Sequence, residues 1–167
     1  KIAIVYEGEQ YMLKFPPHPK RNKEMSYTNS CISEYLGSHI FEIIGIPVQE
    51  TILGTYNVNG KEKVVVACKD FTSHDTVIQD FASLKNTLID SGHSGYGTEL
   101  SEILEAIEEQ SAVNPSELKR RFWDMFMVDA LIGNWDRHNG NWGFLYNSRT
   151  DEISIAPVYN CGSCLYP

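Results

Sequence analysis

The sequence predicts an α+β fold in two lobes. Its first half is rich in strand-like runs and contains one clear helical pattern, whereas its second half is dominated by amphipathic helical patterns. A stretch rich in glycine and serine, residues 92–97, separates the two halves. Strands and helices that are segregated along the chain, without regular alternation, favour an α+β fold over an α/β fold.

The chain begins with two β-prone runs, Ile2 to Tyr6 and Gln10 to Phe15, on either side of Glu7-Gly8-Glu9. This pattern predicts a hairpin. The prolines that start at Pro16 end the second strand, because proline cannot donate a ladder hydrogen bond.

A helix is predicted from Ser26 to Gly45, with Thr28 or Asn29 as its cap. Gly45 ends it, followed by Pro47. The apolar residues that recur at helical spacing are Ile32, Leu36, Ile40 and Ile43.

Two strands, Val48 to Val58 and Lys61 to Lys69, follow on either side of Asn59-Gly60. Asn-Gly is the strongest two-residue signal for a β-hairpin, because both residues tolerate a positive φ. The continuous apolar run from Val64 to Ala67 predicts a buried strand centre.

The second half begins with Thr76 to Asp90, which we interpret as a hinge followed by a helix. An acidic amphipathic helix is predicted from Glu99 to Gln110. A longer helix is predicted next. Asn114 caps its start, Pro115 takes the first helical position, and Gly133 ends it. The remaining predicted elements are two strands that form a hairpin, Trp142 to Tyr146 and Glu152 to Val158.

Composition narrows the functional class. The 167 residues carry a net charge of −8, which disfavours direct binding of nucleic acid or of an anionic membrane. No apolar run approaches the ~20 residues of a membrane helix, and no signal peptide is recognisable. The four cysteines are therefore expected to be reduced thiols in the cytoplasm. Because the chain lacks an initiator methionine, we expect it to be a piece of a longer protein.

The most informative motif lies near the end of the chain. Asp136 follows the long predicted helix, Asn141 comes five residues later, and the last hairpin leads to Asn160 before Cys-Gly. A carboxylate, an amide and a third metal-binding residue in this order are typical of phosphoryl-transfer sites that bind Mg²⁺. Asparagine and aspartate are also common turn formers, so each residue alone could be structural.

Lys14 is the second candidate. It ends an apolar strand, from which its ammonium could reach phosphate oxygens, and Glu34 on the next helix could pair with it. Taken alone, both could be ordinary solvated residues. Arg137 could pair with Asp136 or with a phosphate, and His138 is expected to be a structural hydrogen-bonding residue more than a base.

Cys161 and Cys164 have C-x-x-C spacing. A structural zinc site would require a second pair, whereas Cys31 and Cys68 are single and far apart. A thioredoxin-like motif would open a helix after a strand, which is not the context here. A zinc or redox role is therefore a minor alternative.

The chain resembles HipA-like serine/threonine kinases, the toxin kinases of bacterial toxin–antitoxin pairs and their stand-alone relatives. The resemblance covers nearly the whole chain. The residues that carry the resemblance are Tyr11 to Pro16, Ser33 to Tyr35, Gly45 to Val48, Asp129 to Asn141 and Ala156 to Asn160. Lipid kinases of the phosphatidylinositol type share a similar Asp-Arg-His-x-x-Asn loop, but the acidic charge and the lack of a basic or amphipathic membrane-facing helix argue against them.

The resemblance implies a two-lobed protein-kinase-like fold. An N-lobe of antiparallel strands and one helix would span residues 1–76, a hinge and linker 77–98, and the start of a mostly helical, truncated C-lobe 99–167. ATP, Mg²⁺, a protein Ser/Thr substrate and an antitoxin partner are also implied.

The resemblance further implies roles for individual residues. Asp136 would be the catalytic base, while Asn141 and Asn160 would hold magnesium. The residues that would bind the nucleotide are Lys14, Glu34, Asp80, Phe81, Ala82 and His138, with the adenine lying near residues 77–82.

The chain departs from the family pattern at Asn160, where the family has a metal-binding aspartate. An amide lacks the negative charge of a carboxylate, so we expect weakened metal binding and low or absent transfer. The alternative function is a pseudokinase that binds a nucleotide or a partner. The glycine/serine-rich phosphate loop expected before Lys14 and the helical lobe expected after Asn160 are also missing.

Overall fold

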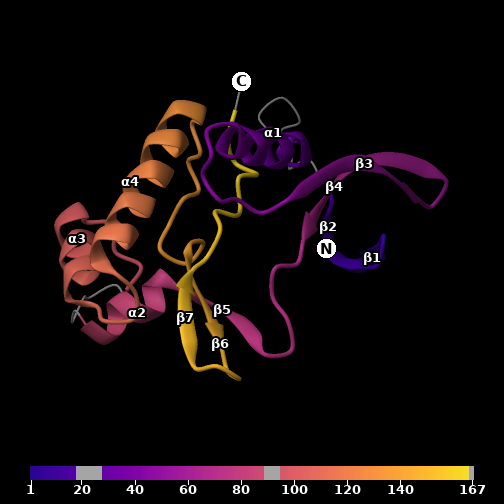
Figure 1. The fold of residues 1–167 in the computed structure, drawn as a ribbon. Coiled ribbons are helices and arrows are strands. Elements are labelled where there is room, and N and C mark those ends of the chain that lie inside the picture. Colours follow the sequence, from indigo (N-terminus) through magenta and orange to yellow (C-terminus); the bar gives the residue numbers. More distant parts are fainter. Residues whose placement is uncertain (18–27, 89–94, 166–167) are drawn as a thin grey trace. The chain divides into compact units, whose positions relative to one another are not determined.

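The computed structural model describes residues 1–17, 28–88 and 95–165, and the chain divides into two compact units (Figure 1). Unit 1 comprises Lys1–Phe71, Asp129–Trp135 and Val158–Pro167, and unit 2 comprises Thr72–Val128 and Asp136–Pro157. Each unit contains an antiparallel sheet and at least one helical segment, so the predicted α+β class is confirmed.

Unit 1 is built on a four-stranded antiparallel sheet in the order β1-β2-β4-β3 (Figure 1). The two predicted hairpins are present, and their turns use left-handed residues, Glu7 and Gly8 in the first and Asn59 and Gly60 in the second. These turns fit the twist of adjacent strands. The strands are β1 (Ile2–Tyr6), β2 (Glu9–Lys14), β3 (Thr51–Val58) and β4 (Lys61–Lys69).

Helix α1 (Ser30–Ile43) packs against β3 and β4. Alternate residues of β4 point to opposite faces of the sheet. Val66 and Cys68 pack with Cys31 of α1, whereas Val65 and Ala67 belong to a second cluster with Tyr11 and Leu13. The centre of β4 is therefore buried on both faces, as its apolar run predicted, except that Val64 is exposed.

In unit 1, α1 begins at Ser30 and β3 begins later than predicted. The predicted helix start at Ser26 lies outside the described residues, and Asn29 takes the N-cap position of α1 without a side-chain hydrogen bond. Strand β3 begins at Thr51, three residues after the predicted Val48. Val48 forms a parallel bridge with Val158, a residue of the distant C-terminal segment, and therefore does not extend the β3–β4 ladder.

Unit 2 contains the three-stranded antiparallel sheet β5-β6-β7 together with α2, α3 and most of α4. Asn114 Oδ1 accepts hydrogen bonds from the amides of Ser116 (2.9 Å) and Glu117 (3.2 Å), so the predicted cap of α4 is confirmed. The elements are β5 (Thr76–Asp80), α2 (Phe81–Leu88), α3 (Leu100–Glu109), α4 (Pro115–Ile132), β6 (Gly143–Asn147) and β7 (Glu152–Ile155).

Strand β5 was not expected from the sequence, which indicated a hinge at this point. Its residues pair with β6 from Thr76↔Asn147 to Asp80↔Gly143. The partner strand is more than sixty residues away in sequence, so no local pattern reveals it. Helix α2 follows directly, and the predicted helix end at Asp90 lies outside the described residues.

An aromatic cluster forms the centre of unit 2. Phe81 is fully buried and stacks on Trp142, with ring centroids 4.1 Å apart and planes 18° apart. Phe122 of α4 and Phe144 of β6 lie beside this pair. The cluster ties α2, α4 and β6 together around the loop that precedes β6, and this loop contains the motif from Asp136 to Asn141.

Candidate functional site

Lys14 and Glu34 form an ion pair in unit 1. Lys14 Nζ at the end of β2 lies 2.9 Å from Glu34 Oε2 on α1, and the Glu34 side chain is only 3% exposed. Burial lowers the pKa of Lys14, but the carboxylate of Glu34, with a contribution from Cys68, more than offsets this effect, so the pKa lies above its ordinary value. The ammonium is therefore charged at neutral pH and fixed in direction.

Glu34 also contacts the C-terminal loop of the unit. Its second oxygen, Oε1, accepts a hydrogen bond from the backbone N–H of Cys161 at 3.0 Å. One buried carboxylate thus connects the strand lysine to the residue that follows Asn160. Gly162 makes this approach possible, because a Cβ atom there would lie 2.8 Å from Glu34 Oε2.

A cavity of about 370 Å³ is lined by Lys14, Glu34 and Asn160, all of which belong to unit 1. Asn160 adopts the left-handed conformation (φ +63°), which asparagine tolerates better than most residues. The structure therefore brings together three of the residues that the sequence singled out. The other residues that line the cavity are Lys1, Phe15, Pro17, Ser30, Cys31, Gly162 and Ser163.

Asn134 is a residue of this region that the sequence reasoning passed over. Its Nδ2 group donates to Asp129 Oδ1 at 2.8 Å and lies 3.5 Å from the carbonyl oxygen of Asn160. Asn134 thereby connects the end of α4 to the loop that carries Asn160. The only signal in the sequence was its position immediately before Trp-Asp-Arg-His.

The loop from Asp136 to Asn141 lies in unit 2 and is closed by the Asn141 side chain. Asn141 Nδ2 donates to the carbonyl oxygen of Asp136 at 2.6 Å, and Asn141 Oδ1 accepts the backbone N–H of His138 at 3.1 Å. Arg137 donates to the backbone carbonyl of Asn141 at 3.0 Å. Asn141 is buried while Asp136 is exposed, so the amide fixes the loop and the carboxylate faces solvent.

His138 contributes to the internal hydrogen bonding of the same loop. Its Nδ1 atom accepts the N–H of Gly140 at 3.1 Å, so the proton of a neutral ring resides on Nε2. The neighbouring Asn139 is buried and donates to the carbonyl oxygens of Gly95 and Gly97, both at 2.9 Å. These bonds fix the loop between α4 and β6.

Asp80, Phe81 and Ala82, the residues expected near the adenine, lie where β5 meets α2. Asp80 Oδ1 accepts the N–H of Ser83 at 2.8 Å and caps α2. The N–H groups of Phe81 and Ala82 donate to the carbonyl oxygens of Trp142 and Asn139, each at 2.9 Å. These two amides are therefore already hydrogen-bonded within unit 2.

The four cysteines are free and buried. Cys164 Sγ lies 3.3 Å from the carbonyl oxygen of Ser33, and a Cβ atom on Gly37 would lie 2.8 Å from Cys161 Cβ and 2.9 Å from Cys164 Sγ. The C-x-x-C segment packs closely on α1 in this way. Within residues 1–17, 28–88 and 95–165, no three His, Cys, Asp or Glu side chains are grouped so that they could hold a metal ion. No helix in the same ranges is long and apolar enough to cross a bilayer.

Comparison with known proteins identifies the family of the chain. Residues 1–166 match the model of the HipA-like C-terminal domain family. The serine/threonine-protein kinase CtkA of Helicobacter pylori strain J99 is 56% identical over 167 residues, which is the whole of this chain and 50% of that protein. The chain therefore spans about half the length of this relative.

A solved structure supports the same relationship. The crystal structure of the Helicobacter pylori proinflammatory kinase CtkA matches with a TM-score of 0.86 and 51% identity, covering 98% of this chain and 55% of that one. The family match and the two similarities extend over nearly every residue of the chain. The chain therefore belongs to the HipA-like C-terminal domain family and is related to a serine/threonine protein kinase.

Proposed function

We propose that this chain forms the nucleotide-binding and catalytic-loop part of a HipA-like serine/threonine protein kinase, which uses ATP to phosphorylate a protein hydroxyl. The observation that carries the proposal is the buried Lys14–Glu34 pair in a cavity that also contains Asn160. A fixed ammonium beside an open cavity is suited to binding phosphate oxygens, as the strand lysine of protein kinases does.

The loop of unit 2 supports the same reaction. Asp136 is exposed, and its backbone carbonyl is held by Asn141, so the position of the carboxylate is constrained at its base. In the proposed reaction the oxygen of the substrate hydroxyl attacks the γ-phosphorus of ATP, and Asp136 accepts the proton of that hydroxyl. ADP then leaves, and the phosphoryl group is transferred to the substrate.

The adenine is proposed to bind along β5. This strand is at the edge of its sheet among the described residues, so alternate backbone groups between Thr76 and Asp80 face away from β6. Because the amides of Phe81 and Ala82 are already hydrogen-bonded, the edge of β5 is the better source of contacts.

Magnesium fits the available donors poorly. Proteins usually hold Mg²⁺ through one or two carboxylates together with substrate phosphates. The two candidate ligands here, Asn141 and Asn160, are neutral amides, and Asn141 Oδ1 already accepts the N–H of His138. This donor set favours the second candidate function, a pseudokinase that binds nucleotide without efficient transfer.

Substitution of Asn160 by aspartate distinguishes the two functions. Aspartate tolerates the left-handed backbone of residue 160 nearly as well as asparagine, so Asn160→Asp adds the missing charge with little strain. With the full-length protein, we expect ATP binding in calorimetry to become strongly dependent on Mg²⁺ and phosphate incorporation into protein Ser or Thr to rise.

Asp136→Asn in the Asn160→Asp background is the matched control, because it should abolish transfer and leave ATP binding in place. Transfer by the unmodified protein would establish the kinase, and ATP binding without transfer would establish the pseudokinase. Absence of ATP binding in both forms would refute the proposal. An antitoxin-type partner remains a further prediction, to be tested by co-purification with the natural full-length protein.

A further inference from the structure

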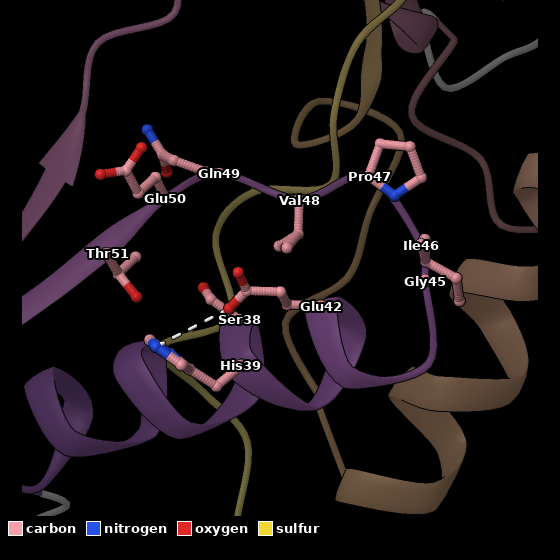
Figure 2. Close-up of a pocket in the computed structure, with 10 residues that line it drawn as sticks. All are labelled: Ser38, His39, Glu42, Gly45, Ile46, Pro47, Val48, Gln49, Glu50 and Thr51. Carbon is pink, nitrogen blue, oxygen red and sulfur yellow. Dashed lines mark ion pairs between the residues drawn. The ribbon is translucent and has the colours of Figure 1, made fainter.

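Unit 1 contains a cavity of about 630 Å³ between α1 and residues 45–51 that takes no part in the proposed reaction (Figure 2). The side chains of His39 and Glu42, joined by the dashed line in Figure 2, are 36% and 69% exposed. The hydroxyl oxygens of Ser38 and Thr51 are covered by protein atoms. Among the described residues, this cavity therefore presents no buried polar group that a ligand could reach.

Unit 2, in contrast, contains a fully buried lysine, Lys85 of α2. Its Nζ atom lies 2.6 Å from Glu102 Oε2 on α3 and donates to the carbonyl oxygen of Gly97 at 3.0 Å. Replacement of a buried ion pair by apolar residues is often neutral or stabilising, so such a pair is weak evidence for a role in stability. The lysine at this position is better explained by the geometry that it imposes on its acceptors.

The carbonyl oxygen of Gly97 is also bonded to the loop that contains Asp136. The two N–H groups of Asn139 Nδ2 donate to the carbonyl oxygens of Gly97 and Gly95, both at 2.9 Å. The carbonyl oxygen of Gly97 thus accepts one hydrogen bond from Lys85 and one from Asn139, which fills its two lone pairs. Lys85 therefore reaches the loop through one shared acceptor.

Asn139 is held on its other sides as well. Its side chain is buried, and its Oδ1 atom accepts Trp142 Nε1–H at 3.4 Å. Its backbone carbonyl oxygen accepts the N–H of Ala82, at the start of α2, at 2.9 Å. Because both ends of the side chain and the backbone carbonyl are bonded, Asn139 has little freedom to move independently of α2 and of residues 95–97.

Residues 95–97 pack closely against both neighbours. Gly95 has a φ of +79°, and a Cβ atom there would lie 2.0 Å from the carbonyl oxygen of Ala82 on α2. On the loop, a Cβ atom on Gly140 would lie 2.7 Å from Cε1 of Tyr96. The segment thus contacts α2 and the loop at van der Waals distance, so a displacement of the segment is transmitted to the loop.

We propose that Lys85 is a positioning residue for Asp136, because it fixes the loop that carries this carboxylate through Gly97 and Asn139. The inference rests on the proposed kinase function for its chemical consequence. The link from Lys85 to the loop, however, can be measured without turnover. The consequence is large in principle, since a misplacement of about 1 Å at a reacting group can lower a rate by about 100-fold.

Hydrogen exchange of the full-length protein, followed by mass spectrometry, tests the link. Lys85→Met keeps an unbranched side chain of similar length and removes the donor to Gly97. The variant should fold, because Glu102 is 34% exposed and water can solvate its carboxylate. Peptides that contain the amides of His138 and Asn141, both bonded within the loop, should exchange about tenfold faster. Exchange in the β6–β7 ladder should not change.

Lys119→Met is the matched control. Lys119 also lies 2.6 Å from a glutamate, Glu108, but its side chain is 43% exposed. This substitution should leave exchange in the loop unaltered. If Lys85→Met does not fold, Glu102→Gln takes its place, because it weakens the hold on Lys85 without emptying a buried position. A smaller acceleration in the same loop peptides is then expected.

A double-mutant cycle tests the route through Asn139. Asn139→Ala should itself accelerate exchange in the loop, since it removes the donor to Gly97. Lys85→Met should add nothing in this background, because the shared acceptor no longer joins Lys85 to the loop. Fully additive effects would overturn the proposal. Equal acceleration in the loop and in the β6–β7 ladder would also overturn it, because Lys85 would then stabilise unit 2 as a whole.

Kinetics of the full-length Asn160→Asp protein test the chemical consequence. In this background Lys85→Met should lower kcat for protein phosphorylation about tenfold through misplacement of Asp136, and should leave the KM for ATP unchanged. An unchanged kcat beside faster loop exchange would refute the positioning role. If no form of the protein transfers phosphate, the proposed kinase function fails, and the exchange cycle alone decides whether Lys85 fixes the loop.

Discussion

Glu34 Oε1 accepts the backbone N–H of Cys161 at 3.0 Å across 127 positions of sequence, while the other oxygen of the same carboxylate pairs with Lys14. A single side chain on α1 therefore fixes both the end of β2 and the loop after Asn160. This carboxylate therefore helps to set the geometry of the cavity that Lys14 and Asn160 line.

Removal of the Glu34 carboxylate is expected to destabilise unit 1. Glu34→Ala leaves Lys14, whose side chain is 19% exposed, without its partner and removes the acceptor for Cys161 N–H. Removing one partner of a buried ion pair lowers the free energy of unfolding by about 3 kcal/mol. Glu34→Gln should cost less, because the amide oxygen can still accept from Cys161. Urea denaturation measures both variants, and equal stability of Glu34→Ala and the parent protein would contradict the expectation.

Gly37 is expected to be essential for the packing of α1 on the Cys161–Cys164 segment. In an open helix, Gly→Ala adds about 1 kcal/mol of stability. At Gly37, however, the new Cβ would lie within 3 Å of Cys161 Cβ and Cys164 Sγ, and overpacking costs about 1–3 kcal/mol. Gly37→Ala should therefore lower the unfolding free energy. Gly54→Ala is the control, since no atom lies within 4 Å of a Cβ there. If the Gly37→Ala protein is more stable than the parent, the Cys161–Cys164 segment can shift to accommodate the new methyl group.

The Cys68 thiol is expected to be inert in the folded protein. Burial raises its pKa from 9.0 to about 12, although the nearby Lys14 ammonium acts in the opposite direction. Reaction with a thiol reagent at pH 8 should therefore be slow until urea unfolds the chain, because the thiolate is the reactive form. Rapid native-state labelling of Cys68, identified by mass spectrometry, would contradict the buried position.

The same shift predicts a pH dependence of stability. The folded pKa lies above the unfolded value, so the unfolded state loses its proton first as the pH rises. The contribution of Cys68 is complete below about pH 9 and is lost progressively between about pH 9 and 12. Urea midpoints of the parent and of Cys68→Ala should converge across this interval. If the urea midpoints of the two proteins fall in parallel as the pH rises, the Cys68 thiol is not the cause of the pH dependence.

Asn141 is expected to hold the loop that carries Asp136. Asn141→Ala removes the bond to the Asp136 carbonyl and leaves the N–H of His138 without its acceptor. Loss of buried hydrogen bonds of this kind costs about 1–3 kcal/mol. Amide hydrogen exchange at His138 should accelerate, whereas exchange in the β1–β2 hairpin should not change. Asn141→Asp is the matched variant, because it preserves an acceptor for His138 and loses the donor to Asp136.

Local sequence patterns predicted the elements whose conformation depends on near neighbours. Strand β4 was predicted at its observed bounds, because Asn59-Gly60 fixes the turn and the apolar run fixes the burial. The start of α4 was predicted from Asn114 and Pro115 for the same reason. Strand β5 was not predicted, and β3 was predicted too long, because both depend on pairing with segments that come much later in the chain.

The sequence by itself determined the family, the α+β class and the identity of Lys14, Glu34, Asp136, Asn141 and Asn160 as candidate residues. These follow from residue type and spacing, which are properties of the chain before it folds. Only the tertiary structure showed that Glu34 bonds both Lys14 and the Cys161 amide. Such contacts join residues that are distant in sequence, and their geometry is set by the packing of the sheet and helix that carry them.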